Sequence, residues 1–127
     1  MNGILYVALG GAIGASARHL LSGAAFRMAG PGFPVGTLAA NVIGSFAMGV
    51  LVVWLTLKVD GGANLRLFLG VGLLGGFTTF SAFSLDAMLM FEKKAYGVFA
   101  AYVGSSVILS LLALAAGLLL ARRVFAL

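Results

Sequence analysis

The sequence predicts an all-α membrane protein with four transmembrane helices, and three observations support this. Hydrophobic residues fill 62% of the 127 positions and charged residues only 9%, whereas a water-soluble domain carries about 25% charged residues. Four stretches are long and apolar enough to cross a bilayer, which takes about 20 such residues. The connections between them are short, and the first contains both prolines. We therefore expect residues 1–127 to form a single transmembrane domain.

Turn-forming residues bound the expected helices, which cover residues of about 4–26, 35–57, 65–91 and 96–121. The first helix ends before Pro31 and Pro34, because proline interrupts a helix. The second ends before the turn Asp60-Gly61-Gly62, and the third ends at the charged residues 92–94. Neighbouring helices must run antiparallel because their connections are short. The amino terminus lacks the basic region of a secretory signal, so the first helix is expected to be retained.

The third expected helix has a weak point near its middle, in the stretch Gly75-Gly76-Phe77-Thr78-Thr79-Phe80-Ser81-Ala82-Phe83-Ser84. Each glycine costs a helix about 1 kcal/mol relative to alanine, and threonine hydroxyls compete for nearby backbone groups. Backbone freed from a helix inside a membrane survives only where protein buries it or a polar cavity solvates it. Interrupted membrane helices are a recurring way to build ion sites. The stretch predicts a broken helix, and close packing at the glycines is the alternative.

Composition excludes several classes of function. The chain has no cysteine, so it forms no disulfide and has no thiolate chemistry. Its single histidine, His19, cannot form a multi-histidine metal site within one subunit. The three acidic residues make no carboxylate pair, and we expect no enzyme activity. The net charge of +5 is spread over short loops, and a nucleic-acid partner is therefore not expected.

Lysine and arginine counts on the two sides of the membrane set the orientation of a membrane protein. The side with both termini and the second connection carries Lys58, Arg66, Arg122 and Arg123. The opposite side carries Arg18, Arg27, Lys93 and Lys94. The count is four against four, or four against three without Arg18 if that residue lies within the membrane, and gives the chain no reason to choose one orientation. We therefore predict insertion in both orientations and pairing as an antiparallel homodimer.

Two sets of polar residues recur every four positions within helices. They are Thr37, Asn41 and Ser45 in the second helix and Tyr102, Ser106 and Ser110 in the fourth. This spacing places each set on one helical face. Asn41 is the strongest single signal, because an amide near the bilayer needs partners, either a neighbouring helix or a passing ligand. The hydroxyls either bond to their own backbone or line a path for an ion. Two such faces beside a broken helix favour the path.

Four further residues stand out within the expected spans. Arg18 is costly inside a bilayer and either draws anions into a vestibule or extends its charge to the interface. Phe80 and Phe83 share a face after the weak point and either pack or turn their electropositive ring edges toward a small anion. Asp86 is the only acidic residue within a span.

The stretch from Gly75 to Ser84 closely resembles the signature of the Fluc (CrcB) fluoride channels. The segment Gly36-Thr37-Leu38 followed by Asn41 is similar to that family's second motif. Arg18, after a glycine-rich first helix, is similar to its third. The resemblance covers the length, the four helices and the short loops of the whole chain.

This resemblance implies a dual-topology antiparallel homodimer that exports fluoride passively through two pores in the bacterial inner membrane. It also implies a central structural sodium ion, held by backbone carbonyls of Gly75 and Thr78 from each subunit. The pore residues implied by matching motif positions are Asn41, Phe80, Phe83, Tyr102, Ser106 and Ser110. The resemblance places Arg18 and Ser81 in the vestibule.

The chain departs from the family pattern at a few positions. Ala82 stands where the family usually has threonine, and Leu114 stands where the row of hydroxyls in the fourth helix often continues. Asp86 is often glutamate in relatives. These departures concern the details of the vestibule and the hydroxyl track.

Two other functions fit four short membrane helices. One is a proton-coupled exporter of organic cations, which needs a membrane carboxylate in its first helix, whereas no acidic residue precedes Asp60 here. The other is a non-transporting assembly protein whose glycine-rich faces bind another membrane protein. The first predicts proton-coupled cation flux dependent on Asp86, and the second predicts no ion flux.

Overall fold

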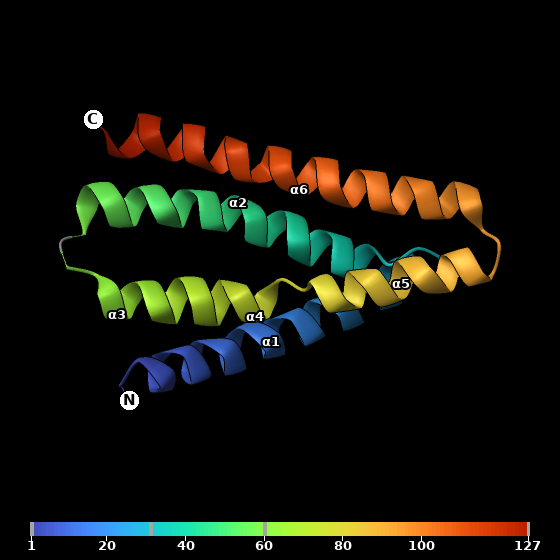
Figure 1. Ribbon diagram of the computed structural model, residues 1–127, viewed down its shortest axis with the longest axis horizontal. Coiled ribbons are helices and arrows are strands. Elements are labelled where there is room, and N and C mark those ends of the chain that lie inside the picture. The colour runs from blue at the N-terminus through green and yellow to red at the C-terminus, as the bar shows by residue number, and fades with distance from the viewer. Residues whose placement is uncertain (1, 31, 60, 127) are drawn as a thin grey trace.

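The computed structural model describes residues 2–30, 32–59 and 61–126, which form helices joined by short connections and contain no strand (Figure 1). The elements are α1 (Asn2–Ala29), α2 (Val35–Lys58), α3 (Ala63–Leu65), the π-helix η1 (Arg66–Leu74), α4 (Gly75–Phe77), α5 (Phe80–Glu92) and α6 (Tyr96–Phe125). Four helical stretches in this part of the chain are long and apolar enough to span a membrane, at residues 3–29, 35–58, 63–92 and 96–125. The prediction of an all-α, multi-pass membrane protein is therefore confirmed. Pro31 and Asp60 lie outside the described residues.

The third span is assembled from several helical pieces. Its first part, α3, η1 and α4, is continuous and includes a nine-residue π-helix, a rare form that frequently occurs at functional sites. Gly75 and Gly76 are helical residues of α4. Thr78 and Thr79 are extended, with φ/ψ of −88°/157° and −153°/125°. These two residues separate α4 from α5.

The helices lie side by side in the order α6, α2, the third span and α1 across the view of Figure 1. Helix α2 packs along α6, and helix α1 packs against η1 and α4. Both termini lie at the same end of the bundle as the connection from α2 to α3, while the other two connections lie at the opposite end (Figure 1).

Glycines allow α1 to approach the third span backbone to backbone. A Cβ atom added at Gly72 would lie 2.8 Å from the carbonyl oxygen of Val7, and one added at Gly76 would lie 2.9 Å from that of Gly11. Small residues at membrane helix interfaces permit this close packing. The contact brings the second half of α1, including Arg18, to the end of α4.

Large apolar side chains lie mainly on the outside of the bundle, as in Ile108, Leu111 and Leu112 of α6. The buried core is small and centres on Phe83, Ala87 and Tyr102, which join α5 to α6. An apolar exterior around a small core is the arrangement expected when lipid, rather than water, surrounds the helices.

Candidate functional site

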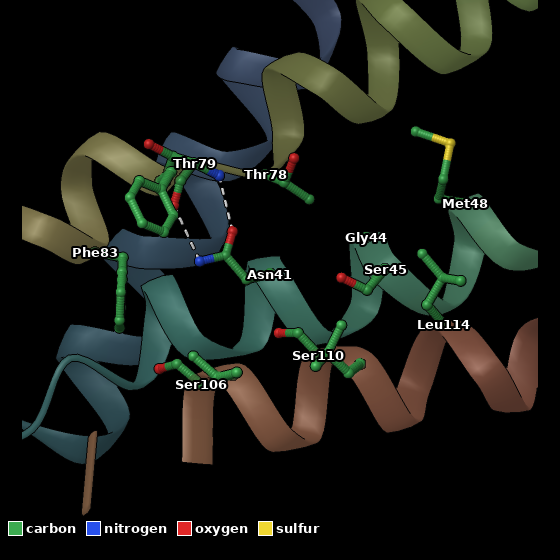
Figure 2. Close-up of a pocket in the computed structure, with 13 residues that line it drawn as sticks. Asn41, Gly44, Ser45, Met48, Thr78, Thr79, Phe83, Ser106, Ser110 and Leu114 are labelled. Atoms are coloured by element: carbon green, nitrogen blue, oxygen red, sulfur yellow. Dashed lines mark hydrogen bonds between the residues drawn. The ribbon is translucent and has the colours of Figure 1, made fainter. Parts of the chain in front are cut away.

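The extended residues between α4 and α5 are held by a side chain from α2. The Nδ2 of Asn41 donates a hydrogen bond to the carbonyl oxygen of Thr79 at 3.1 Å. The backbone N–H of Thr79 donates to the Oδ1 of Asn41 at 2.8 Å. Both ends of the amide are thus bonded to the backbone of one residue (Figure 2). The amide satisfies backbone groups that would otherwise lie unpaired inside the membrane.

Two other side chains satisfy the helix ends beside Thr78 and Thr79. The Nε of Arg18 donates to the carbonyl oxygen of Gly76 at 3.2 Å, so a cation lies at the carbonyl end of α4, where the helix dipole favours it. The hydroxyl of Thr79 accepts a hydrogen bond from the N–H of Ala82 at 3.2 Å, which makes Thr79 an N-cap of α5. Arg18 therefore points at the end of α4.

These contacts replace the hydrogen bonds of an uninterrupted helix. In an α-helix, the N–H of Thr79 would bond to the carbonyl of Gly75, and the N–H of Ala82 would bond to that of Thr78. Here the first N–H donates to Asn41 and the second to the Thr79 hydroxyl. Among the described residues, no hydrogen bond to either carbonyl replaces those lost. The carbonyl oxygens of Gly75 and Thr78 therefore lack their helical hydrogen-bond donors, and the assignment of both carbonyls to a sodium site stays a prediction.

A cavity of about 380 Å³ lies between the extended residues, α2 and α6. Its lining residues are Asn41, Gly44, Ser45, Met48, Thr78, Thr79, Phe80, Phe83, Ser106, Val107, Ser110, Leu111 and Leu114. None of these described residues carries a charge. Gly44 makes room for Thr78, whose Cγ2 occupies the place that a Cβ would take. Met48 and Leu114 lie at the end of the cavity away from Phe83 (Figure 2).

Two hydroxyl groups of α6 line the cavity without a hydrogen-bond partner among the described residues. They are the Oγ atoms of Ser106 and Ser110, and both atoms are buried. An unsatisfied buried hydroxyl is costly, and one in a native structure calls for an explanation. Both serines come from the row predicted from sequence.

The two phenylalanines of α5 differ in environment although their ring centroids lie 5.4 Å apart. Phe83 is 9% exposed and packs against Tyr102 with a centroid distance of 5.2 Å. Phe80 is 77% exposed, so its ring lies on the outer surface of the subunit beside the cavity. The cavity therefore opens toward the outside of the single chain.

Several predicted residues lie near the cavity without lining it. Tyr102 is fully buried, and its hydroxyl donates to the Oδ2 of Asp86 at 3.2 Å. Ser81 is exposed, with its Oγ atom 3.3 Å from the Oγ1 of Thr79. Asp86 belongs to a second, smaller cavity of about 170 Å³, together with Ser22 and Thr37. The assignments of Tyr102 to the pore and of Ser81 and Arg18 to the vestibule stay predictions.

Sequence reasoning missed some of the cavity lining. Gly44 and Met48 follow Asn41 by three and seven positions, so helical spacing alone places them on its face. Thr79 lay within the quoted signature, but its backbone role depends on a side chain 38 positions away in the sequence. No cluster of three or more His, Cys, Asp or Glu side chains that could hold a metal occurs among residues 2–30, 32–59 and 61–126.

Comparisons with known proteins agree on one family. The family model described as "CrcB-like protein, Camphor Resistance (CrcB)" matches residues 5–118. A protein of Caulobacter vibrioides (strain NA1000 / CB15N) is 52% identical over 127 residues, covering 99% of this chain and 100% of the relative. A protein of Phenylobacterium zucineum is 56% identical over the same length, with the same coverage.

A protein of Cereibacter sphaeroides (strain ATCC 17029 / ATH 2.4.9) is 56% identical over 122 residues, covering 96% of each chain. All three relatives are named "Fluoride-specific ion channel FluC", the name of an ion channel and not of an enzyme. Because the family model matches residues 5–118 and these relatives align along nearly the whole chain, this protein belongs to the CrcB family.

Proposed function

We propose that the protein is a fluoride-specific passive channel that exports cytoplasmic fluoride across the bacterial inner membrane. The observation that carries this proposal is the uncharged cavity with two unpartnered hydroxyl groups, Ser106 and Ser110. The names of the relatives supply the identity of the ion. Such a channel fits a route in which fluoride enters acidic surroundings as neutral HF, ionises in the cytoplasm and leaves down the membrane potential.

The cavity chemistry suits a small, strongly hydrated anion. Hydroxyl groups can donate hydrogen bonds in place of the lost water molecules, and phenyl edges such as that of Phe83 carry positive electrostatic potential. Conduction requires binding that is favourable enough for entry and weak enough for exit. An uncharged lining meets both needs, because a lysine or arginine side chain in direct contact with fluoride would hold the ion too tightly.

The exposure of Phe80 supports a dimer. A ring that lies 77% exposed on one side of the cavity would complete a pore wall once a second copy covered it. The balanced lysine and arginine count favours insertion in both orientations. We therefore propose an antiparallel homodimer in which each subunit contributes to two pores.

The carbonyl groups of Gly75 and Thr78 fit a sodium ion, because their helical donors bond elsewhere. Hard cations bind oxygen ligands, and the carbonyl ends of interrupted membrane helices coordinate such ions. Two carbonyls are too few to enclose a cation, which supports contributions from both subunits. A bound sodium ion would supply a fixed positive charge that favours a nearby anion.

Fluoride efflux from liposomes containing only the purified protein tests the proposal. We expect rapid fluoride efflux and no chloride efflux under the same gradient. Phe83→Ile should lose the flux because it removes an aryl edge from the cavity while keeping an apolar side chain, and chemical cross-linking should still capture the dimer. A purified wild-type protein without fluoride flux would reject the channel.

The organic-cation exporter gains no support from the cavity. Asp86, a carboxylate of the third span, lies outside its lining and accepts a hydrogen bond from Tyr102. Proton-coupled cation transport that required Asp86 would favour that alternative over the fluoride channel.

A further inference from the structure

We propose that Asn41 is a positioning residue for the cation site. Its Oδ1 accepts the N–H of Thr79, which would otherwise bond to the carbonyl of Gly75, and so leaves that carbonyl free to bind sodium. This inference rests on the proposed channel and adds a second role to a side chain predicted to contact fluoride.

The Asn41 amide is directed at the backbone of Thr79. Its Oδ1 lies 2.8 Å from the N–H donor of Thr79, and its Nδ2 lies 3.1 Å from the carbonyl oxygen of the same residue. This pairing imitates the two hydrogen bonds that a neighbouring strand would make with an extended residue. Both functional atoms of the amide therefore hold the backbone in the present structure.

The pairing of Asn41 with Thr79 changes the surroundings of the Gly75 carbonyl. Its carbonyl belongs to α4, whose dipole places partial negative charge at this end. The usual helical partner of that carbonyl is the N–H that Asn41 binds. The next carbonyl, Gly76, is occupied by the Nε of Arg18. Arg18 therefore satisfies the carbonyl of Gly76, and Asn41 keeps the carbonyl of Gly75 available.

Asn41 lies between the proposed cation site and the cavity. The same side chain lines the cavity with Ser106 and Ser110. A change at Asn41 should therefore act on both the cation site and the anion path. These effects can be separated, because the cation site needs an oxygen that accepts the N–H of Thr79, whereas the anion path needs the absence of negative charge.

The test compares purified wild-type protein with Asn41→Leu, Asn41→Asp and Ser45→Ala. Ser45 is the matched control, because it lies one turn further along α2, lines the same cavity and makes no hydrogen bond with the described residues of the α4–α5 connection. The first measurement is the shift in thermal unfolding temperature between sodium and N-methyl-D-glucamine at equal ionic strength. The second is fluoride efflux from liposomes.

We expect sodium to raise the unfolding temperature of the wild type and of Ser45→Ala by the same amount, because ligand binding to the folded state stabilises it. Asn41→Leu should lose this shift, since the N–H of Thr79 is free to return to Gly75. Asn41→Asp should keep the shift, because a carboxylate also accepts that N–H, yet it should lose fluoride efflux through repulsion of the anion.

Persistence of the full sodium shift in Asn41→Leu, or its loss in Asn41→Asp, would overturn the inference. If Asn41→Leu does not fold, the inference can still be overturned by Asn41→Asp, through loss of a sodium shift that Ser45→Ala keeps. A wild type that conducts fluoride without any sodium shift would remove the cation site, and the inference with it, while leaving the channel intact. A wild type that does not conduct would instead reject the proposed function.

Discussion

The role of single hydroxyl groups in ion conduction can be tested by mutation, because two of those in the cavity have no hydrogen-bond partner among the described residues. The Oγ atoms of Ser106 and Ser110 are buried and unpartnered among the described residues, whereas Ser105 bonds to the carbonyl of Tyr102 at 3.3 Å. Leaving a buried polar group unsatisfied costs about 1–3 kcal/mol. Removing the hydroxyl of Ser106 or Ser110 therefore breaks no hydrogen bond between the described residues.

Ser110→Ala should lower fluoride efflux about tenfold or more without lowering the unfolding temperature. A hydrogen bond to a charged group is worth about 1.5–3 kcal/mol, and about 1.4 kcal/mol corresponds to a factor of ten. Liposome efflux and thermal unfolding in detergent measure the two effects. Ser105→Ala, which changes a serine outside the cavity lining, should leave efflux unchanged. Equal efflux from Ser110→Ala and the wild type would remove this hydroxyl from the ion path.

Within the third span, the connection from α4 to α5 depends on local capping. Thr79 caps α5 by accepting the N–H of Ala82, and its backbone pairs with Asn41. Thr79→Val keeps the shape of the side chain but removes the acceptor. We expect a destabilisation of about 1 kcal/mol, the usual cost of a lost N-cap, seen as a lower unfolding temperature. An unchanged unfolding temperature would mean that the hydrogen bond from Ala82 to the Thr79 hydroxyl does not stabilise the folded protein.

The contact between α1 and α4 depends on the absence of side chains. Gly76→Ala would place a Cβ 2.9 Å from the Gly11 carbonyl and 3.2 Å from the Ala15 backbone nitrogen. Neither backbone atom can move aside alone, so we expect a loss of about 1–3 kcal/mol, typical of overpacking. Thermal unfolding measures it. Gly104→Ala is the matched control in α6, because nothing lies within 4 Å of its added Cβ; comparable destabilisation of both variants would argue against the close contact.

At the scale of the whole molecule, charge at the two ends of the bundle governs orientation. Both termini and the α2–α3 connection share one end (Figure 1). Four basic residues belong to that end and three to the other, because Arg18 bonds to Gly76 within the third span. Arg122 and Arg123 lie near the carboxyl terminus, and Lys93 and Lys94 lie in the connection from α5 to α6. All four side chains are exposed, so they can be changed without disturbing the core.

Opposite charge changes should force opposite orientations. Lys93→Gln with Lys94→Asn should place the termini in the cytoplasm, and Arg122→Gln with Arg123→Gln should place them outside. Asparagine is used because residue 94 has a positive φ of 61°, which asparagine tolerates. Each variant expressed alone should lose cellular fluoride resistance, and co-expression should restore it. Full resistance from either variant alone would contradict the antiparallel dimer.

The expected spans and the observed helices differ by only a few residues at each end, because hydrophobic length and proline positions act locally. Expected residues 35–57 and 96–121 correspond to α2 and α6, which end at Lys58 and Phe125. The exact location of the extended residues was harder to predict. Glycine weakens a helix intrinsically, but Gly75 and Gly76 remain helical while Thr78 and Thr79 are extended. The π-helical form of η1 had no sequence signal.

Composition and periodicity by themselves determined that this chain spans a membrane four times, and its motifs placed it in its family. Those features depend on neighbours in the sequence and on the solvent that apolar side chains require. Tertiary structure alone decided which backbone groups stay unpaired: Asn41 from α2 and Arg18 from α1 reach the third span and occupy specific amide and carbonyl groups. Hydrogen bonds over such sequence separations exist only after the helices pack, so no local pattern can specify them.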